Sequence, residues 1–235
     1  MKTLWIFGDS FSTGFDYNNL HVNQKNYMTI MNINNFKIWP DVLGEKLNCE
    51  VKNFAKGGNS NYEIFQNFCD NCGLIKENDI VIIGWALIVK FRISENHKFL
   101  NLGRDINRDI GMVKKETLKE IIDNRSKLFK DKRDRWAGEV YLWERAIRTL
   151  SKHKNFKAFF WTAEEPRLIY NLNEEEKKDK NYLCSESNEM LLSYLNKMGC
   201  TSMSDETGGI VSDSHMGLHG HIKQAEIFYN TIING

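Results

Sequence analysis

Short apolar runs alternate along the chain with longer segments whose apolar residues recur three and four positions apart. The runs predict one strand that ends at Gly8, three strands at residues 50–54, 79–84 and 156–161, and a short fifth strand at 200–203. The helical periods fall at residues 39–47, 61–72, 113–129, 136–150, 191–198 and 217–233. Alternation of this kind is typical of parallel βαβ units. We therefore predict an α/β fold with a central parallel sheet of about five strands and helices on both faces.

Two segments lack this regular pattern. Residues 15–38 are rich in asparagine and show no clear period, which predicts a long loop near the active edge of the sheet. Residues 90–134 are charged and aromatic and are longer than a crossover between strands needs. We expect a lid or rim insertion around residues 90–135. Its cations Lys90, Arg92 and Arg104 could meet an acidic substrate, although a solvated surface is the favoured interpretation.

The composition narrows the class of protein. The chain has 235 residues, two prolines and no low-complexity tract, so we expect a single domain over residues 1–235. A net charge of +1 and the lack of a basic stripe argue against nucleic-acid or membrane partners. The apolar run at the amino terminus is too short for a signal peptide or a spanning helix, which favours a cytoplasmic location. Oligomeric state is left open.

The number of cysteines is consistent with a cytoplasmic location. Their number is five, and an odd number does not indicate a secreted disulfide framework. Cys69 and Cys72 form a C-x-x-C pair, but they lie in a segment of helical period. A buried helix face is therefore favoured over a redox or metal role.

Candidate chemistry gathers at the two ends of the chain. The sequence Gly8-Asp9-Ser10 follows the first strand directly, which places Ser10 at the carboxyl edge of the sheet, where ligands bind in open α/β folds. Near the other end, Asp213 and His215 lie two residues apart. Serine, imidazole and carboxylate form a triad that is defined by geometry and not by chain order. Without that partner segment, Gly-Asp-Ser would indicate only a turn.

The segment after the second strand contributes a second feature. Lys56-Gly-Gly58 precedes Ser60 and Glu63, whose spacing predicts a capping box at the start of a helix. Gly58 therefore lies at the carboxyl edge, just before the amino end of a helix. A backbone N–H in that place can stabilise a developing oxyanion.

The chain resembles the SGNH, or GDSL-type, hydrolase family in three blocks. The first is Gly8-Asp9-Ser10, the second is Asn53-Phe-Ala-Lys-Gly-Gly58, and the third contains Asp213, His215, Gly220 and His221. The resemblance implies a three-layer flavodoxin-like fold and a serine esterase or deacylase that needs no cofactor and acts on a small-molecule or carbohydrate ester. It assigns Ser10 as nucleophile, His215 as base and Asp213 as its acid, with the N–H groups of Ser10 and Gly58 as the oxyanion hole.

The chain departs from the family after its third predicted strand. The family commonly has Gly-x-Asn-Asp there, and this chain reads Gly84-Trp-Ala86. Ala86 has no side-chain donor. Asn59 and Asn61 are possible substitute oxyanion donors, although both residues also suit a loop or helix start that satisfies backbone groups, which is the favoured interpretation.

Several alternatives stay open at this point. His219 is a rival base, although packing at a helix start is favoured for both His219 and His221. A zinc site built from these histidines with Asp213 and His215 has suitable residue types, but it would leave Ser10 and Gly58 without a role, so no metal is expected. The same triad would serve an acyltransferase. A ligand-binding protein that has lost catalysis is a further alternative, motivated by Ala86. Glu164 and Glu165 could line a pocket or belong to a solvated loop.

Overall fold

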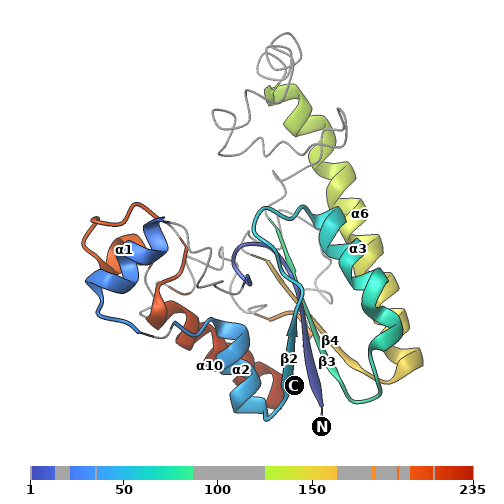
Figure 1. The fold of residues 1–235 in the computed structure, drawn as a ribbon. Coiled ribbons are helices and arrows are strands. Elements are labelled where there is room, and N and C mark those ends of the chain that lie inside the picture. Colours follow the sequence, from blue (N-terminus) through green and yellow to red (C-terminus); the bar gives the residue numbers. More distant parts are fainter. Residues whose placement is uncertain are drawn as a thin grey trace.

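The computed structural model of the chain describes residues 2–13, 22–34, 36–86, 125–162, 181–183, 195, 202–213 and 215–234, with the side chains of the longest helix from residue 138 onward. Within these residues, four parallel strands form one sheet in the order β2-β1-β3-β4 (Figure 1). The strands are β1 Thr3–Phe7, β2 Glu50–Asn53, β3 Ile80–Trp85 and β4 Lys157–Thr162. The predicted α/β class is confirmed, and this order is that of flavodoxin-like sheets.

The two central strands are apolar because both of their faces are covered. Every residue of β1 and β3 is buried, as expected for parallel strands enclosed by helices. They pair in a register that sets Phe7 beside Ile83. The next residues along, Gly8 just after β1 and Gly84 as the penultimate residue of β3, therefore lie near the same edge of the sheet.

Helices cover the sheet on both sides (Figure 1). Helices α2 Trp39–Leu47 and α10 Leu218–Asn234 pack against each other on one face, with a core that includes Ile6, Ile82 and Phe228. Helices α3 Asn61–Asn71 and α6 Arg125–Lys154 lie side by side on the other face, and a 3₁₀ turn at Cys72–Leu74 follows α3. The three-layer arrangement predicted from the sequence is therefore observed.

A proline and a capping box in the sequence mark the first turns of two of these helices. Pro40 lies in the first turn of α2, where its missing N–H costs nothing. The predicted capping box of α3 is present: the Ser60 hydroxyl accepts from the N–H of Glu63, and the Glu63 carboxylate accepts from the N–H of Ser60. The loop of residues 54–59 that precedes α3 therefore enters the helix with a fixed geometry.

The predicted loop at 15–38 is partly wrong, because helix α1 Val22–Ile30 lies within it. This helix has no apolar stripe that the sequence could reveal. Its one buried residue, Tyr27, donates to the Glu206 carboxylate and accepts from the N–H of Leu218 at 2.8 Å. Burial and the bond to Glu206 raise the pKa of Tyr27, so its phenol is a fixed donor. Tertiary contact stabilises α1 where local sequence does not.

The predicted fifth strand at 200–203 is also wrong for its described residues. Ser202 forms only an isolated bridge with Met216, and Met203 begins the short helix α9 Met203–Glu206. The reason is a second capping box, in which Ser202 and Asp205 satisfy each other's backbone N–H groups. Cys200 and Thr201 lie outside the described residues.

Two predicted burial patterns need correction. In α10 the apolar period predicts Ile222, Ala225, Tyr229 and Ile232 as the inner face. Ala225 and Ile232 are buried as predicted, whereas Ile222 is 37% exposed and Tyr229 is only partly buried. The polar residues His221 and Gln224 are buried in the same face, which apolar periodicity does not reveal. In α3 the helix is confirmed, but Cys69 is exposed and Cys72 only partly buried, both as free thiols.

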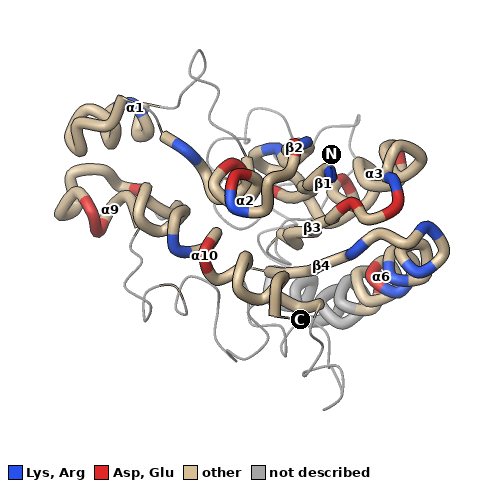
Figure 2. The backbone as a smooth tube through the Cα atoms, turned by 90° about the horizontal axis from the view of Figure 1, so that it is seen from below, with Lys and Arg blue, Asp and Glu red and all other residues tan. Residues whose placement is uncertain are grey.

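Several predictions fall outside the described residues. These include most of the lid segment at 90–135, the cations Lys90, Arg92 and Arg104, the glutamates Glu164 and Glu165, and most of the helices at 113–129 and 191–198. Leu195 of the latter helix is described, and it is helical and buried. No helix in the described part of the chain is long and apolar enough to cross a membrane. Basic and acidic residues are interspersed along the described elements in Figure 2.

One buried carboxylate fixes the amino ends of the strands. Asp79, which precedes β3, accepts from the N–H of Thr3 at 2.9 Å, the Trp5 indole at 2.9 Å and the N–H of Lys76 at 3.0 Å. Burial alone would raise the pKa of Asp79, but the hydrogen bonds from Lys76, Thr3 and Trp5 outweigh it and lower the pKa. Asp79 therefore ties β1 to the turn before β3.

We predict that Asp79→Asn destabilises the fold by about 1.5–3 kcal/mol, because an amide cannot accept from all three donors without turning one of its own N–H groups toward them. Urea unfolding followed by tryptophan fluorescence measures the change. Asp70→Asn on the exposed face of α3 is the matched control and should unfold like the wild type. Equal midpoints for the two variants would contradict the role of Asp79.

Candidate active site

Ser10 lies in a tight turn directly after β1. The N–H of Ser12 donates to the carbonyl of Asp9 at 3.0 Å, and the N–H of Phe11 donates to the Asp9 carboxylate at 3.1 Å. The Asp9 carboxylate thus stabilises the turn itself. The Ser10 side chain stays partly exposed at the carboxyl edge of the sheet.

The structure brings the two ends of the chain together at this turn. His215 Nε2 lies 2.9 Å from the Ser10 hydroxyl oxygen, and His215 Nδ1 lies 2.6 Å from Oδ1 of Asp213. The same Asp213 oxygen accepts from the backbone N–H of His215 at 2.9 Å. The carboxylate therefore holds both the backbone and the ring of His215, and the far ring nitrogen faces the serine.

Helix α9 supports the loop that carries this pair. The N–H of Met203 donates to the carbonyl of His215 at 2.9 Å, and the N–H of Ser204 donates to the carbonyl of Asp213 at 3.1 Å. Both donors belong to the first turn of α9, where N–H groups have no partner inside the helix. The short helix that replaced the predicted strand thus fixes the backbone on both sides of the imidazole.

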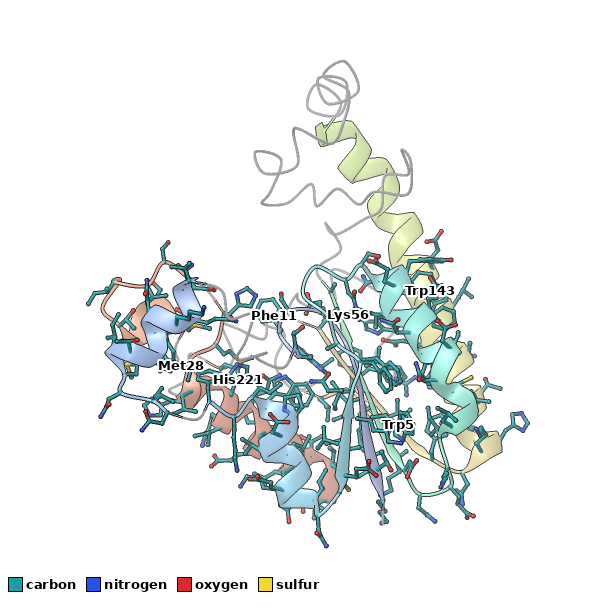
Figure 3. The ribbon with its side chains drawn as sticks, in the orientation of Figure 1. Trp5, Phe11, Met28, Lys56, Trp143 and His221 are labelled. Carbon is teal, nitrogen blue, oxygen red and sulfur yellow. The ribbon has the colours of Figure 1, made fainter. Side chains whose placement is uncertain are left out.

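Gly58 follows β2 in a turn on the other side of Ser10. Its φ of +84° lies in the region that favours glycine, and the space beside its Cα is open. The turn is tied to the residue after β1 by the N–H of Lys56, which donates to the carbonyl of Gly8 at 3.2 Å. Figure 3 shows Lys56 and Phe11 near the carboxyl ends of the strands, with Trp5 farther toward the opposite end.

The two asparagines satisfy backbone groups, which was the favoured interpretation. Asn59 Nδ2 donates to the carbonyl of Gly8 at 3.1 Å. Asn61 bonds both backbone groups of Ala86, accepting from its N–H at 2.7 Å and donating to its carbonyl at 3.2 Å. Asn61 therefore holds the backbone of the residue that directly follows β3.

Two residues of the site were missed by the sequence analysis. The ring of Phe11 packs against the imidazole of His215 with centroids 5.0 Å apart. The Trp39 indole donates to the carbonyl of Phe11 at 2.9 Å, which links the turn that contains Ser10 to α2. Neither contact has a sequence signal beyond the position of Phe11 next to Ser10.

The remaining histidines have separate environments. His219 is largely exposed, and its Nδ1 lies 3.8 Å from Glu206. His221 is buried, and its Nδ1 accepts from the N–H of Trp39 at 3.3 Å. Helix-start packing, the favoured interpretation, describes His221. In the described ranges no group of three or more His, Cys, Asp or Glu side chains is arranged to hold a metal ion.

Comparisons with known proteins give a fold likeness only. No family model matches the chain, and no curated protein matches it significantly. Among solved structures, protein YXIM of Bacillus subtilis aligns with a TM-score of 0.52 at 16% identity, covering 99% of this chain and 56% of that one. A lipase from a goat rumen metagenome aligns with a TM-score of 0.49 at 14% identity, covering 98% and 97% of the two chains. An acetyl xylan esterase aligns at 0.47 and 13% identity, covering 98% and 99%.

We predict that protonation of His221 limits stability in acid. Burial, and next the nearby His215, lower the pKa of His221 from 6.5 to about 3. The fold therefore holds a neutral imidazole that the unfolded chain would protonate, so its contribution is present above pH 6.5 and is lost as the pH falls toward 3. The loss is up to about 5 kcal/mol.

Urea unfolding at a series of pH values between 7 and 3 tests this. The curve of stability against pH should be flatter for His221→Gln than for the wild type, while His153→Gln, an exposed imidazole on α6, keeps the wild-type slope. Parallel curves for all three proteins would show that His221 does not titrate on unfolding.

Proposed function

We propose that this chain is a serine ester hydrolase of the SGNH type, which cleaves a small or carbohydrate-linked ester through an acyl-enzyme intermediate. The observation that carries the proposal is the line of contacts from the Ser10 hydroxyl through His215 to Asp213, at 2.9 and 2.6 Å. These three groups come from opposite ends of the chain and meet at the edge of the sheet where substrates bind. The motif resemblance and the fold likeness support the same activity class.

In the first step His215 Nε2 takes the hydroxyl proton of Ser10 as its oxygen attacks the ester carbonyl. Asp213 accepts from Nδ1–H, which selects the tautomer with a free Nε2 and stabilises the imidazolium once it forms. The imidazolium then gives its proton to the departing alcohol. The contact of Phe11 with the imidazole ring limits its rotation during these transfers.

In the second step a water molecule attacks the acyl carbonyl while His215 again serves as base, and Ser10 is released. The oxyanion of each tetrahedral intermediate would be held by the N–H groups of Ser10 and Gly58. Asn59 is a candidate third donor, since its amide has two N–H groups and the Gly8 carbonyl takes one. Asn61 is the weaker candidate because both ends of its amide already bond Ala86.

Acyl transfer to a sugar hydroxyl is the second candidate function. It shares the first step, and only the acceptor of the second step differs. A binding protein without turnover is a third alternative. The intact contact between Ser10 and His215 favours catalysis over it, since a protein that only binds has no need of an aligned base.

We expect Ser10→Ala to lose nearly all hydrolysis of short acyl esters, because the nucleophile is removed. At most, a residual rate of roughly 10³–10⁴ times that in water would remain. A panel of acetyl, butyryl and longer p-nitrophenyl esters measures this and reports the preferred acyl length. Ser151→Ala, on the far side of the sheet, is the control and should keep wild-type rates.

Mass spectrometry after treatment with a fluorophosphonate gives an independent measurement. One adduct per chain should form on Ser10 in the wild type and none on Ser10→Ala. Full esterase activity of Ser10→Ala would reject the proposal, and ligand binding without turnover or labelling in the wild type would favour the binding protein instead.

The role of Asp213 predicts a loss in kcat. Asp213→Asn should lower kcat by about 10³–10⁴-fold with a small change in KM, because the amide favours the wrong imidazole tautomer. Steady-state kinetics on the preferred ester checks the value. A change confined to KM would assign Asp213 to substrate binding.

A further inference from the structure

Three polar side chains on one face of the sheet are buried without a hydrogen-bond partner among the described residues. They are the hydroxyl of Ser12, the indole N–H of Trp161 and both ends of the Gln224 amide. Ser12 and Gln224 are 0% exposed and Trp161 is 1% exposed. Native proteins rarely leave a buried polar group without a hydrogen bond, since each such group lowers the stability of the fold by about 1–3 kcal/mol.

Two of these groups lie over neighbouring glycines at the ends of β1 and β3. A methyl group added to Gly8 would lie 2.8 Å from the Ser12 hydroxyl, and one added to Gly84 would lie 2.8 Å from Nε1 of Trp161. Gly8 follows β1 and Gly84 is the penultimate residue of β3, on adjacent strands whose backbones are about 4.8 Å apart. Ser12 and Trp161 therefore lie over neighbouring positions of the sheet. A water molecule with hydrogen bonds of about 2.8 Å bridges polar atoms up to roughly 5 Å apart.

The third group reaches the same layer from α10. Gln224 lies one turn after His221, which bonds the backbone of Trp39, and one turn before Phe228, whose ring packs against both Trp39 and Trp161. Its amide is therefore enclosed in the part of the core that contains the Trp161 indole. An amide there has two donors and an acceptor to satisfy.

We propose that this region is a polar chamber that binds ordered water beneath the nucleophile turn and connects Ser12, Trp161 and Gln224. The inference is separate from the proposed function, because it rests on unpaired buried groups and not on catalysis. Buried waters typically make about three hydrogen bonds to groups of this kind. The chamber gives the two glycines a role: side chains at either position would meet Ser12 or Trp161.

The position of the chamber suggests what the water does. Ser12 closes the turn that presents Ser10, and its backbone carbonyl is already held by Asn53 Nδ2 at 2.7 Å. Water on its hydroxyl links the same turn to β4 and α10. The nucleophile turn is thereby supported from below by hydrogen bonds as well as by apolar packing.

The sign of a stability change separates a wet chamber from a dry one. Gln224→Met replaces the amide by an apolar side chain of similar length. In a wet chamber the variant loses the hydrogen bonds of Gln224 to water, and Tm should fall by several degrees. In a dry chamber it removes an unsatisfied amide, and Tm should rise.

A double-mutant cycle tests whether the groups share water. Ser12→Ala and Gln224→Met should be non-additive in Tm, whereas Ser151→Ala and Gln224→Met, on opposite faces of the sheet, should be additive. A crystal structure of the wild-type chain beyond 1.5 Å resolution does not depend on any variant folding. Water density within about 3 Å of Ser12 Oγ or Trp161 Nε1 and of Gln224 is expected. A site without water there, or a raised Tm for Gln224→Met with additive cycles, would overturn the proposal.

Discussion

The parallel pairing of β1 with β2 and β3 decides where every candidate residue lies. Because parallel strands all end at the same edge, the turn after β1 presents Ser10 beside the turn after β2 that contains Gly58. The register adds a finer constraint. It places Gly8 and Gly84 side by side on adjacent strands near this edge, so no side chain from these two positions occupies the space next to Ser12 and Trp161. The His215 loop then needs only to reach this edge from one side.

Much of this could be predicted from the sequence, and the reasons are physical. Continuous apolar runs identified β1 and β3, since strands covered on both faces have no polar side to show. The spacing of Ser60 and Glu63 fixed the start of α3. Ser10, Asp213 and His215 were predicted from residue types whose chemistry requires them to meet, and they do meet.

What could not be predicted depends on contacts between distant segments. Helix α1 has no apolar stripe and depends on Tyr27 meeting Glu206 and Leu218. The inner face of α10 was predicted only in part, because the buried residues His221 and Gln224 are polar and His221 is paired with the backbone of Trp39. The support that Trp39 gives to Phe11 is likewise invisible in the sequence, since an indole donor can serve any nearby carbonyl.

The support of the imidazole loop by α9 has a consequence for how such a site can change over time. The carbonyls of Asp213 and His215 accept from main-chain N–H groups of Ser204 and Met203, so the side chains of those two residues matter little to these bonds. A site held by backbone hydrogen bonds tolerates many side-chain substitutions around the few atoms that react. The three-dimensional arrangement can then be kept after most of the sequence identity has been lost.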